Sequence, residues 1–96
     1  MSGHVTRLYG IYDVRGETII GNVVSHRVDA AAVRMFGDIA GDKQSLVGTH
    51  PSDFDLVHIG TLALDTGVID TTDCPRVVVT GAAWLAAQAQ SEASNA

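Results

Sequence analysis

The sequence predicts an α+β fold: a small antiparallel sheet with one central helix packed on it and a C-terminal helix, in the approximate order ββαβββα. Two segments near the start, 4–14 and 18–24, are rich in the β-branched and aromatic side chains that favour strands. Residues 30–40 then place apolar side chains at helical spacing. Short turns separate the strand segments, which indicates antiparallel rather than parallel pairing.

The first two strands form a predicted hairpin with its turn at 15–17. Alternate side chains of a regular strand share one face, which places Arg7, Tyr9 and Arg15 together at even spacing. Gly21, inside the second strand, is a candidate β-bulge because glycine weakens a regular strand.

The predicted helix at 30–40 follows Asp29, whose side-chain oxygen suits an N-cap, and it ends at Gly41. The alanines of this segment favour helix, whereas Gly37 costs about 1 kcal/mol there. Because a glycine inside a helix permits close packing, Gly37 predicts a close approach of this helix to the sheet.

Strand and turn patterns continue through the second half of the chain. Three consecutive valines in 76–80 disfavour helix, and Gly67 supplies the positive φ that a three-residue turn requires. The predicted elements are, in order, a loop at 44–53, a strand at 54–64, a turn at 65–67, a return strand at 68–70, a polar loop at 71–75, a strand at 76–80, a helix at 81–90 and a flexible tail at 91–96. Residues 1–90 therefore form one predicted domain.

The composition is that of a globular protein, since 46% of the 96 residues are apolar and 18% are charged. A chain this short buries only about 60–65% of its unfolded surface, so we expect a homodimer or larger assembly to add stability. The single cysteine, Cys74, excludes an internal disulfide and a zinc ribbon and fits a reducing compartment as a half-buried thiol. Neither a signal peptide nor a membrane span is expected.

One short motif, Asp65-Thr66-Gly67, resembles the active-site triplet of retroviral-type aspartic proteases. That chemistry needs two aspartates that share a proton across a dimer axis. It also needs a glycine-rich flap, and the short stretch after Gly67 contains none. A hairpin turn is the better explanation of the triplet, because aspartate and glycine favour turns for backbone reasons.

Other catalytic and metal-binding patterns are absent from the sequence. The four histidines lack the paired spacing of a metal site, no nucleophile elbow occurs, and the glycines are too scattered for a phosphate-binding loop. We therefore expect a binding protein rather than an enzyme, with no catalytic residues, no metal and no cofactor.

The charge is unevenly distributed along the chain. The net charge of −5 argues against nucleic acid at first. Residues 1–50, however, hold equal numbers of basic and acidic groups, so all of the net charge lies in the second half. A positive face is therefore possible in the first half, with five candidate contact residues: Arg7, Tyr9, Arg15, Arg27 and Arg34. The alternative is an ordinary solvated sheet face with surface arginines.

Several runs of residues, taken in order and spacing across 8–80, resemble one known family. The runs are Leu8-Tyr9-Gly10-Ile11-Tyr12-Asp13, Val33-Arg34-Met35-Phe36-Gly37-Asp38, Ser45-Leu46-Val47, His50-Pro51-Ser52-Asp53-Phe54-Asp55-Leu56, Ile59-Gly60, Asp65-Thr66-Gly67 and Pro75-Arg76. They are similar to the small nonstructural protein of gokushovirus-like microviruses, which are icosahedral phages with circular single-stranded DNA. The chain departs from the usual pattern in extra residues before Leu8 and in its alanine-rich 81–90 segment.

The resemblance implies a role in genome handling, because this family is described as DNA-binding and as assisting the switch to packaged single strands. It also implies the cytoplasm of an infected bacterium as the location. Together with the charge distribution, it predicts binding of the phage's single-stranded DNA. Arginines would hold phosphates and Tyr9 would stack a base.

A rival hypothesis is a protein-interaction module that binds a phage replication protein, a capsid-assembly protein or a host factor. Its surface would be an apolar sheet face or the helix that carries Trp84 and Leu85. Trp84 is expected to anchor the core or a dimer.

Overall fold

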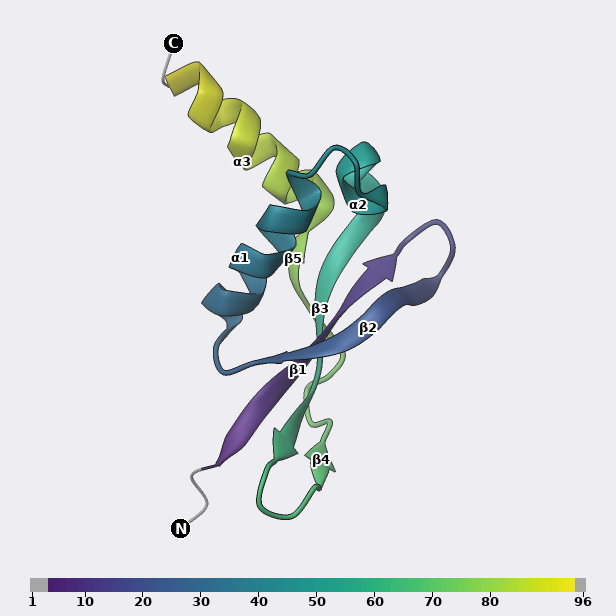
Figure 1. The fold of residues 1–96 in the computed structure, drawn as a ribbon, viewed down its shortest axis with the longest axis vertical. Helices are drawn as coiled ribbons and strands as arrows, with labels where there is room; N and C mark the ends of the chain where they lie inside the picture. The colour runs from purple at the N-terminus through teal and green to yellow at the C-terminus, as the bar shows by residue number, and fades with distance from the viewer. Residues whose placement is uncertain (1–3, 95–96) are drawn as a thin grey trace.

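An antiparallel sheet forms the centre of the computed structural model, which describes residues 4–94 (Figure 1). The chain runs through its elements in the predicted order, with two additional short helical segments before the third strand. The elements are β1 (Val5–Asp13), β2 (Thr18–His26), α1 (Asp29–Ala40), α2 (Leu46–Thr49), the 3-10 helix η1 (Pro51–Asp53), β3 (Phe54–Ala63), β4 (Ile69–Asp70), β5 (Arg76–Thr80) and α3 (Gly81–Ser94). The predicted α+β fold class is confirmed.

The strand order is β2-β1-β3-β4, and β5 pairs with β3 beside β4. The long central strand β3 therefore has β1 along one edge and two short strands in tandem along the other. Its first half pairs with β5, where His58 faces Arg76, and its second half pairs with β4, where Leu62 faces Ile69. This arrangement places the start of β5 beside the middle of the sheet, close to the beginning of α1.

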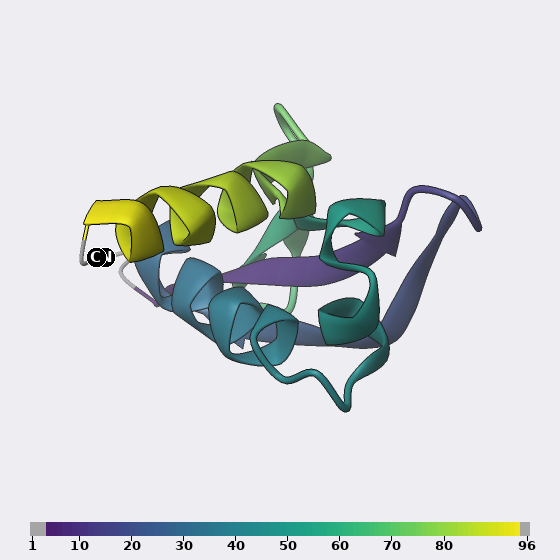
Figure 2. The ribbon, with the colours of Figure 1, turned by 90° about the horizontal axis from the view of Figure 1, so that it is seen from above.

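The core lies between the sheet and the helices. Its largest fully buried side chains are Tyr9 from β1, Phe36 from α1 and Leu56 from β3. Ala32 and Ala40 are also buried, and their small side chains let α1 lie close to the strands. The C-terminal part of α1 lies beside the first turns of α3, and from there the two helices diverge (Figures 1 and 2).

Several predicted backbone features are confirmed. Gly21 has a positive φ of 67°, and the pairing of β1 with β2 shifts register opposite it, as expected of a bulge. Gly67 has a φ of 81° in the turn between β3 and β4. Helix α1 ends at the predicted glycine, since Gly41 is its C-cap.

Other local predictions were wrong. The N-cap of α1 is Val28, and Asp29 is instead the first helical residue, with its carboxylate turned to other partners. Gly37 faces the indole of Trp84 on α3 rather than the sheet. Helix α3 continues through Ser94, beyond its predicted end at residue 90, and residues 95–96 of the tail predicted at 91–96 lie outside the described part.

The predicted loop at 44–53 contains two helical turns, α2 and η1. Ser45 caps α2, because its hydroxyl oxygen accepts a hydrogen bond from the backbone N–H of Gly48 at 2.8 Å. Gly48 is required there, since a Cβ on it would lie 1.8 Å from the carbonyl oxygen of Asp42. None of the helices within residues 4–94 combines the length and apolar character needed to cross a membrane.

Candidate nucleic-acid interface

A polar cluster occupies the N-terminal end of α1, where three side chains converge on the carboxylate of Asp29. The Tyr9 hydroxyl donates to Oδ1 at 2.5 Å, and Arg7 Nη1 donates to the same oxygen at 3.3 Å. Arg76 Nη2 donates to Oδ2 at 3.0 Å. The cluster therefore joins the strands β1 and β5 to the start of α1.

Electrostatics fix the protonation states in this cluster. The hydrogen bond from Tyr9, assisted by Arg76 and Arg7, lowers the pKa of Asp29 despite its partial burial. Burial, followed by the neighbouring carboxylate of Asp29, raises the pKa of Tyr9 to about 12. At neutral pH the cluster therefore holds one carboxylate, one neutral phenol and two guanidinium groups, so it carries an excess of positive charge.

The two guanidinium groups remain accessible to solvent. The side chains of Arg7 and Arg76 are 43% and 41% exposed. A guanidinium carries five N–H donors, and each arginine uses only part of this set on Asp29. The remaining donors can bind the oxygens of a further anion such as a phosphate.

Tyr9 itself is closed off from solvent, which contradicts its predicted role in stacking a base. Its side chain is 0% exposed. The rings of His58 and His26 lie beside its ring, with centroids 5.4 Å and 6.0 Å away. The function of Tyr9 in this structure is to position the Asp29 carboxylate from within the core.

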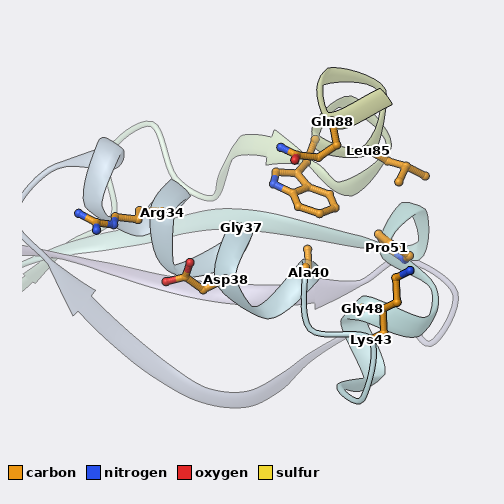
Figure 3. A pocket seen from close by; sticks show the side chains of 11 residues that line it. Arg34, Gly37, Asp38, Ala40, Lys43, Gly48, Pro51, Leu85 and Gln88 are labelled. Carbon is orange, nitrogen blue, oxygen red and sulfur yellow. The ribbon is translucent and has the colours of Figure 1, made fainter. Parts of the chain in front are cut away.

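A groove of about 580 Å³ lies between α1 and α3 (Figure 3). Trp84 contributes its indole, which sits over the helix backbone at Gly37, where a Cβ would lie 3.1 Å from the indole Nε1. The α1–α3 groove is lined by Arg34, Gly37, Asp38, Ala40, Gly41, Lys43, Gly48, Pro51, Trp84, Leu85 and Gln88.

Two cations flank this groove, one at each end. Figure 3 shows Arg34 on α1 well separated from Lys43, which follows the helix. Neither side chain forms an ion pair with any of the residues that the structure describes. The lining has one acidic residue, Asp38, against these two cations. The groove therefore offers an aromatic surface with unpaired positive charge at both ends.

Arg7, Arg76, Arg34 and Lys43 together form what we name the α1 basic strip. Arg7 and Arg76 bind the first residue of α1, Arg34 lies within the helix, and Lys43 follows its C-cap. A helix of 12 residues is about 18 Å long at 1.5 Å per residue. The four cations are thus spread over roughly the length of α1.

The single strand face predicted for Arg7, Tyr9 and Arg15 does not form. Strand β1 ends at Asp13, and Arg15 lies in the following turn, where its Nε donates to Asp53 Oδ1 at 3.1 Å. The strand covers roughly 20 Å from Arg7 to its last residue, Asp13, and Arg15 lies beyond that end.

The other two predicted arginines separate as well. Arg27 lies in the bend after β2, in a hollow lined by residues from the beginning of β1 and the end of β3. Only Arg7 and Arg34 of the five predicted residues belong to the α1 basic strip.

Sequence reasoning missed Arg76, Lys43 and the placement of Trp84 opposite α1. One signal was available for Arg76, because it is the only basic residue among the acids of the second half of the chain. Lys43 had no comparable signal, since its place beside Trp84 depends on how α3 packs.

The described residues include one contact between a thiol and an imidazole. Cys74 Sγ lies 3.5 Å from Nδ1 of His58, which is 7% exposed. Arg76 Nη2 lies 3.5 Å from the same nitrogen. No group of three or more His, Cys, Asp or Glu side chains within the described part of the chain is placed to hold a metal ion.

Comparison with known proteins gives one match. No curated protein and no solved structure matches the chain. The model of one family, described as Phage ORF5 protein, matches residues 6–84. This match runs from the second residue of β1 to the first turn of α3, and it includes all four cations of the α1 basic strip. The chain therefore belongs to the Phage ORF5 protein family.

Proposed function

We propose that this phage protein binds single-stranded DNA along the α1 basic strip. The observation that carries the proposal is the series of four cations along α1 with an indole between them. Guanidinium and ammonium groups bind phosphates without regard to sequence. Trp84 supplies the aromatic surface on which an unpaired base can stack.

The distribution of acids supports the same surface. Within the strip, Asp29, Asp38 and Asp42 oppose the four cations, which leaves a positive excess of one charge. Much of the remaining acidic charge lies elsewhere, with Asp70 in β4 and Asp65 and Asp73 in the turns on either side of it. A local positive strip on an acidic protein gives binding that is moderate and strongly dependent on salt.

We also propose that the protein is not an enzyme. The one thiol–imidazole contact within the described residues, between Cys74 and His58, lacks the third group that orients the base in a nucleophilic site. The Nε2 atom of His58 is buried and has no hydrogen-bond partner. The contact is better explained as packing beneath the Arg76 side chain.

Family membership supports a narrower proposal about origin and role. We propose that the chain is the nonstructural protein of a gokushovirus-like microvirus and acts in the cytoplasm of the infected bacterium. Its binding to DNA would assist genome replication or the switch to single-strand synthesis and packaging. Such a protein must bind and release single-stranded DNA rather than catalyse a reaction. Reversible electrostatic binding by the α1 basic strip suits this role.

Fluorescence anisotropy with a labelled oligonucleotide tests the proposal. We expect binding of a single strand at low salt, weaker binding of the matching duplex, and a linear fall of log K with log salt. The proposal would be overturned if the protein did not bind the single strand at any salt concentration. Stronger binding of the duplex would overturn the assignment to single strands.

A further inference from the structure

The face of the sheet opposite α1 carries an apolar groove. Val57 and Ile59 alternate along β3 with Leu56 and His58, which face the core, so they point to the opposite side. The groove has a volume of about 630 Å³. The open-face groove is lined by Tyr12, Ile19, Val57, Ile59, Thr71, Cys74, Pro75 and Val77.

This face is packed with apolar side chains in its own right. The side chains of Ile19 and Ile59 close over Gly10, where a Cβ would meet their methyl groups at 3.0–3.1 Å. Val57 is only 7% exposed, whereas its partner across the strands, Val77, is 51% exposed. An antiparallel sheet with one solvated face normally alternates apolar and polar residues. Here the middle of β3 places Val57 and Ile59 on the face opposite the core, whereas Asp55 adds a carboxylate to that face near the start of the strand.

We propose that a second copy of this chain covers the open-face groove and forms a two-fold dimer. The strands β1 and β3 have 9 and 10 residues, so the face is roughly 30 Å long and, with four strands abreast, roughly 20 Å wide. Its flat footprint of about 600 Å² is close to the ≈ 800 Å² of accessible surface per partner that a stable interface buries.

Charge also favours a second copy. The lining of the open-face groove contains no Asp, Glu, Lys, Arg or His, and Asp55 lies at its edge, opposite Tyr12. A two-fold contact pairs each surface with itself, and a self-contact fails when it brings like charges together.

The dimer is independent of the proposed DNA binding. The open-face groove and the α1 basic strip lie on opposite sides of the sheet, so both strips of a dimer remain available. Two linked strips would raise the apparent affinity for a long single strand above that for a short one.

Two variants separate the proposal from a general loss of folding. Val77→Glu places a charge in the groove on a residue that is already half exposed. Leu46→Glu makes the same change on the helix side, where Leu46 is 60% exposed and lines a different hollow. Sedimentation equilibrium should show a dimer for the wild type and for Leu46→Glu, and a folded monomer for Val77→Glu. A monomeric wild type at 0.1–1 mM, or a Val77→Glu variant that stays dimeric, would overturn the proposal.

Cys74 supplies a test that needs no substitution. It is the only cysteine of the chain, and it lines the open-face groove. Alkylation of Cys74 in the wild-type protein should slow as the protein concentration rises through the dimer dissociation constant. An alkylation rate that does not depend on protein concentration would contradict the dimer. This test uses the wild-type protein, so it holds even if Val77→Glu fails to fold. A monomer that instead captures another protein or an apolar ligand in this groove would likewise refute a second copy as its occupant.

Discussion

The buried hydroxyl of Tyr9 makes a sharp test of the polar cluster at the start of α1. Tyr9→Phe removes this one oxygen and keeps the ring that packs between His26 and His58. The lost bond is a hydrogen bond to a carboxylate, which contributes about 1.5–3 kcal/mol. Because the Asp29 side chain is 35% exposed, solvent weakens the hydrogen bond. We therefore expect Tyr9→Phe to lower the free energy of unfolding by about 1.5 kcal/mol, at the lower end of this range.

The same substitution removes a dependence of stability on alkaline pH. The pKa of Tyr9 is raised from 10.0 to about 12 in the folded protein. Its stabilisation is thus fully present below pH 10 and is lost as the pH rises through 12, because the unfolded chain ionises first. Two pKa units correspond to roughly 2–3 kcal/mol, and Tyr9→Phe should lack this loss.

Urea denaturation of both proteins between pH 7 and pH 12 measures both effects. Tyr12→Phe is the control for loss of a tyrosine hydroxyl, because the structure assigns the Tyr12 hydroxyl no hydrogen-bond partner among the described residues. Since Tyr12 lines the open-face groove, both tyrosine variants are also compared in the Val77→Glu background. The reasoning would be refuted by a Tyr9→Phe variant within 0.5 kcal/mol of the wild type at pH 7, or by one with an unchanged alkaline profile.

Three further predictions concern the strip, the acid response and the α2 turn. Arg34→Ala and Lys43→Ala should each reduce the salt slope of single-strand binding by about 0.7, whereas Arg15→Ala should leave the slope unchanged in the same anisotropy assay; equal effects of all three would contradict the assignment. The pKa of Asp29 is lower in the folded protein than in the unfolded chain. Its contribution to stability is therefore present at pH values above the pKa of the unfolded chain, and it is lost as the pH falls through the pKa of the folded protein. Asp29→Asn should therefore flatten the acid limb of a pH–stability curve below about pH 4, and a superimposable acid limb would disprove this. Gly48→Ala would bring a Cβ to 1.8 Å from a carbonyl oxygen, so we expect thermal unfolding to show a loss above 2 kcal/mol, and a neutral outcome would show that the α2 turn can move.

The fold was predictable because local patterns decided most of it. Alternating and β-branched residues marked β1, β2 and β3, and Gly67 marked the turn that follows β3. The short α2 was missed because four residues give too little periodicity to detect. Its cap by Ser45 and the requirement for Gly48 appear only when the surrounding loop is folded.

The candidate site was less predictable because it joins segments that are distant in sequence. Arg7 was predicted as a contact residue on the first strand, but Arg76, the second arginine that binds Asp29, lies on the last strand. Tyr9 was assigned to a solvated face because strand alternation does not indicate which face the helices cover. The assignment of Arg15 failed because β1 ends at Asp13, so the alternation that placed it on the same face stops before it.

The intrinsic fluorescence of Trp84 tests the central proposal most directly, because it is the only tryptophan and it lines the α1–α3 groove. Titration with an unlabelled single strand at low salt should quench it to a saturable limit. The double variant Arg34→Ala/Lys43→Ala should require a higher DNA concentration for the same quenching. Tight DNA binding that leaves the Trp84 fluorescence unchanged would contradict the account, as would quenching that the double variant does not weaken.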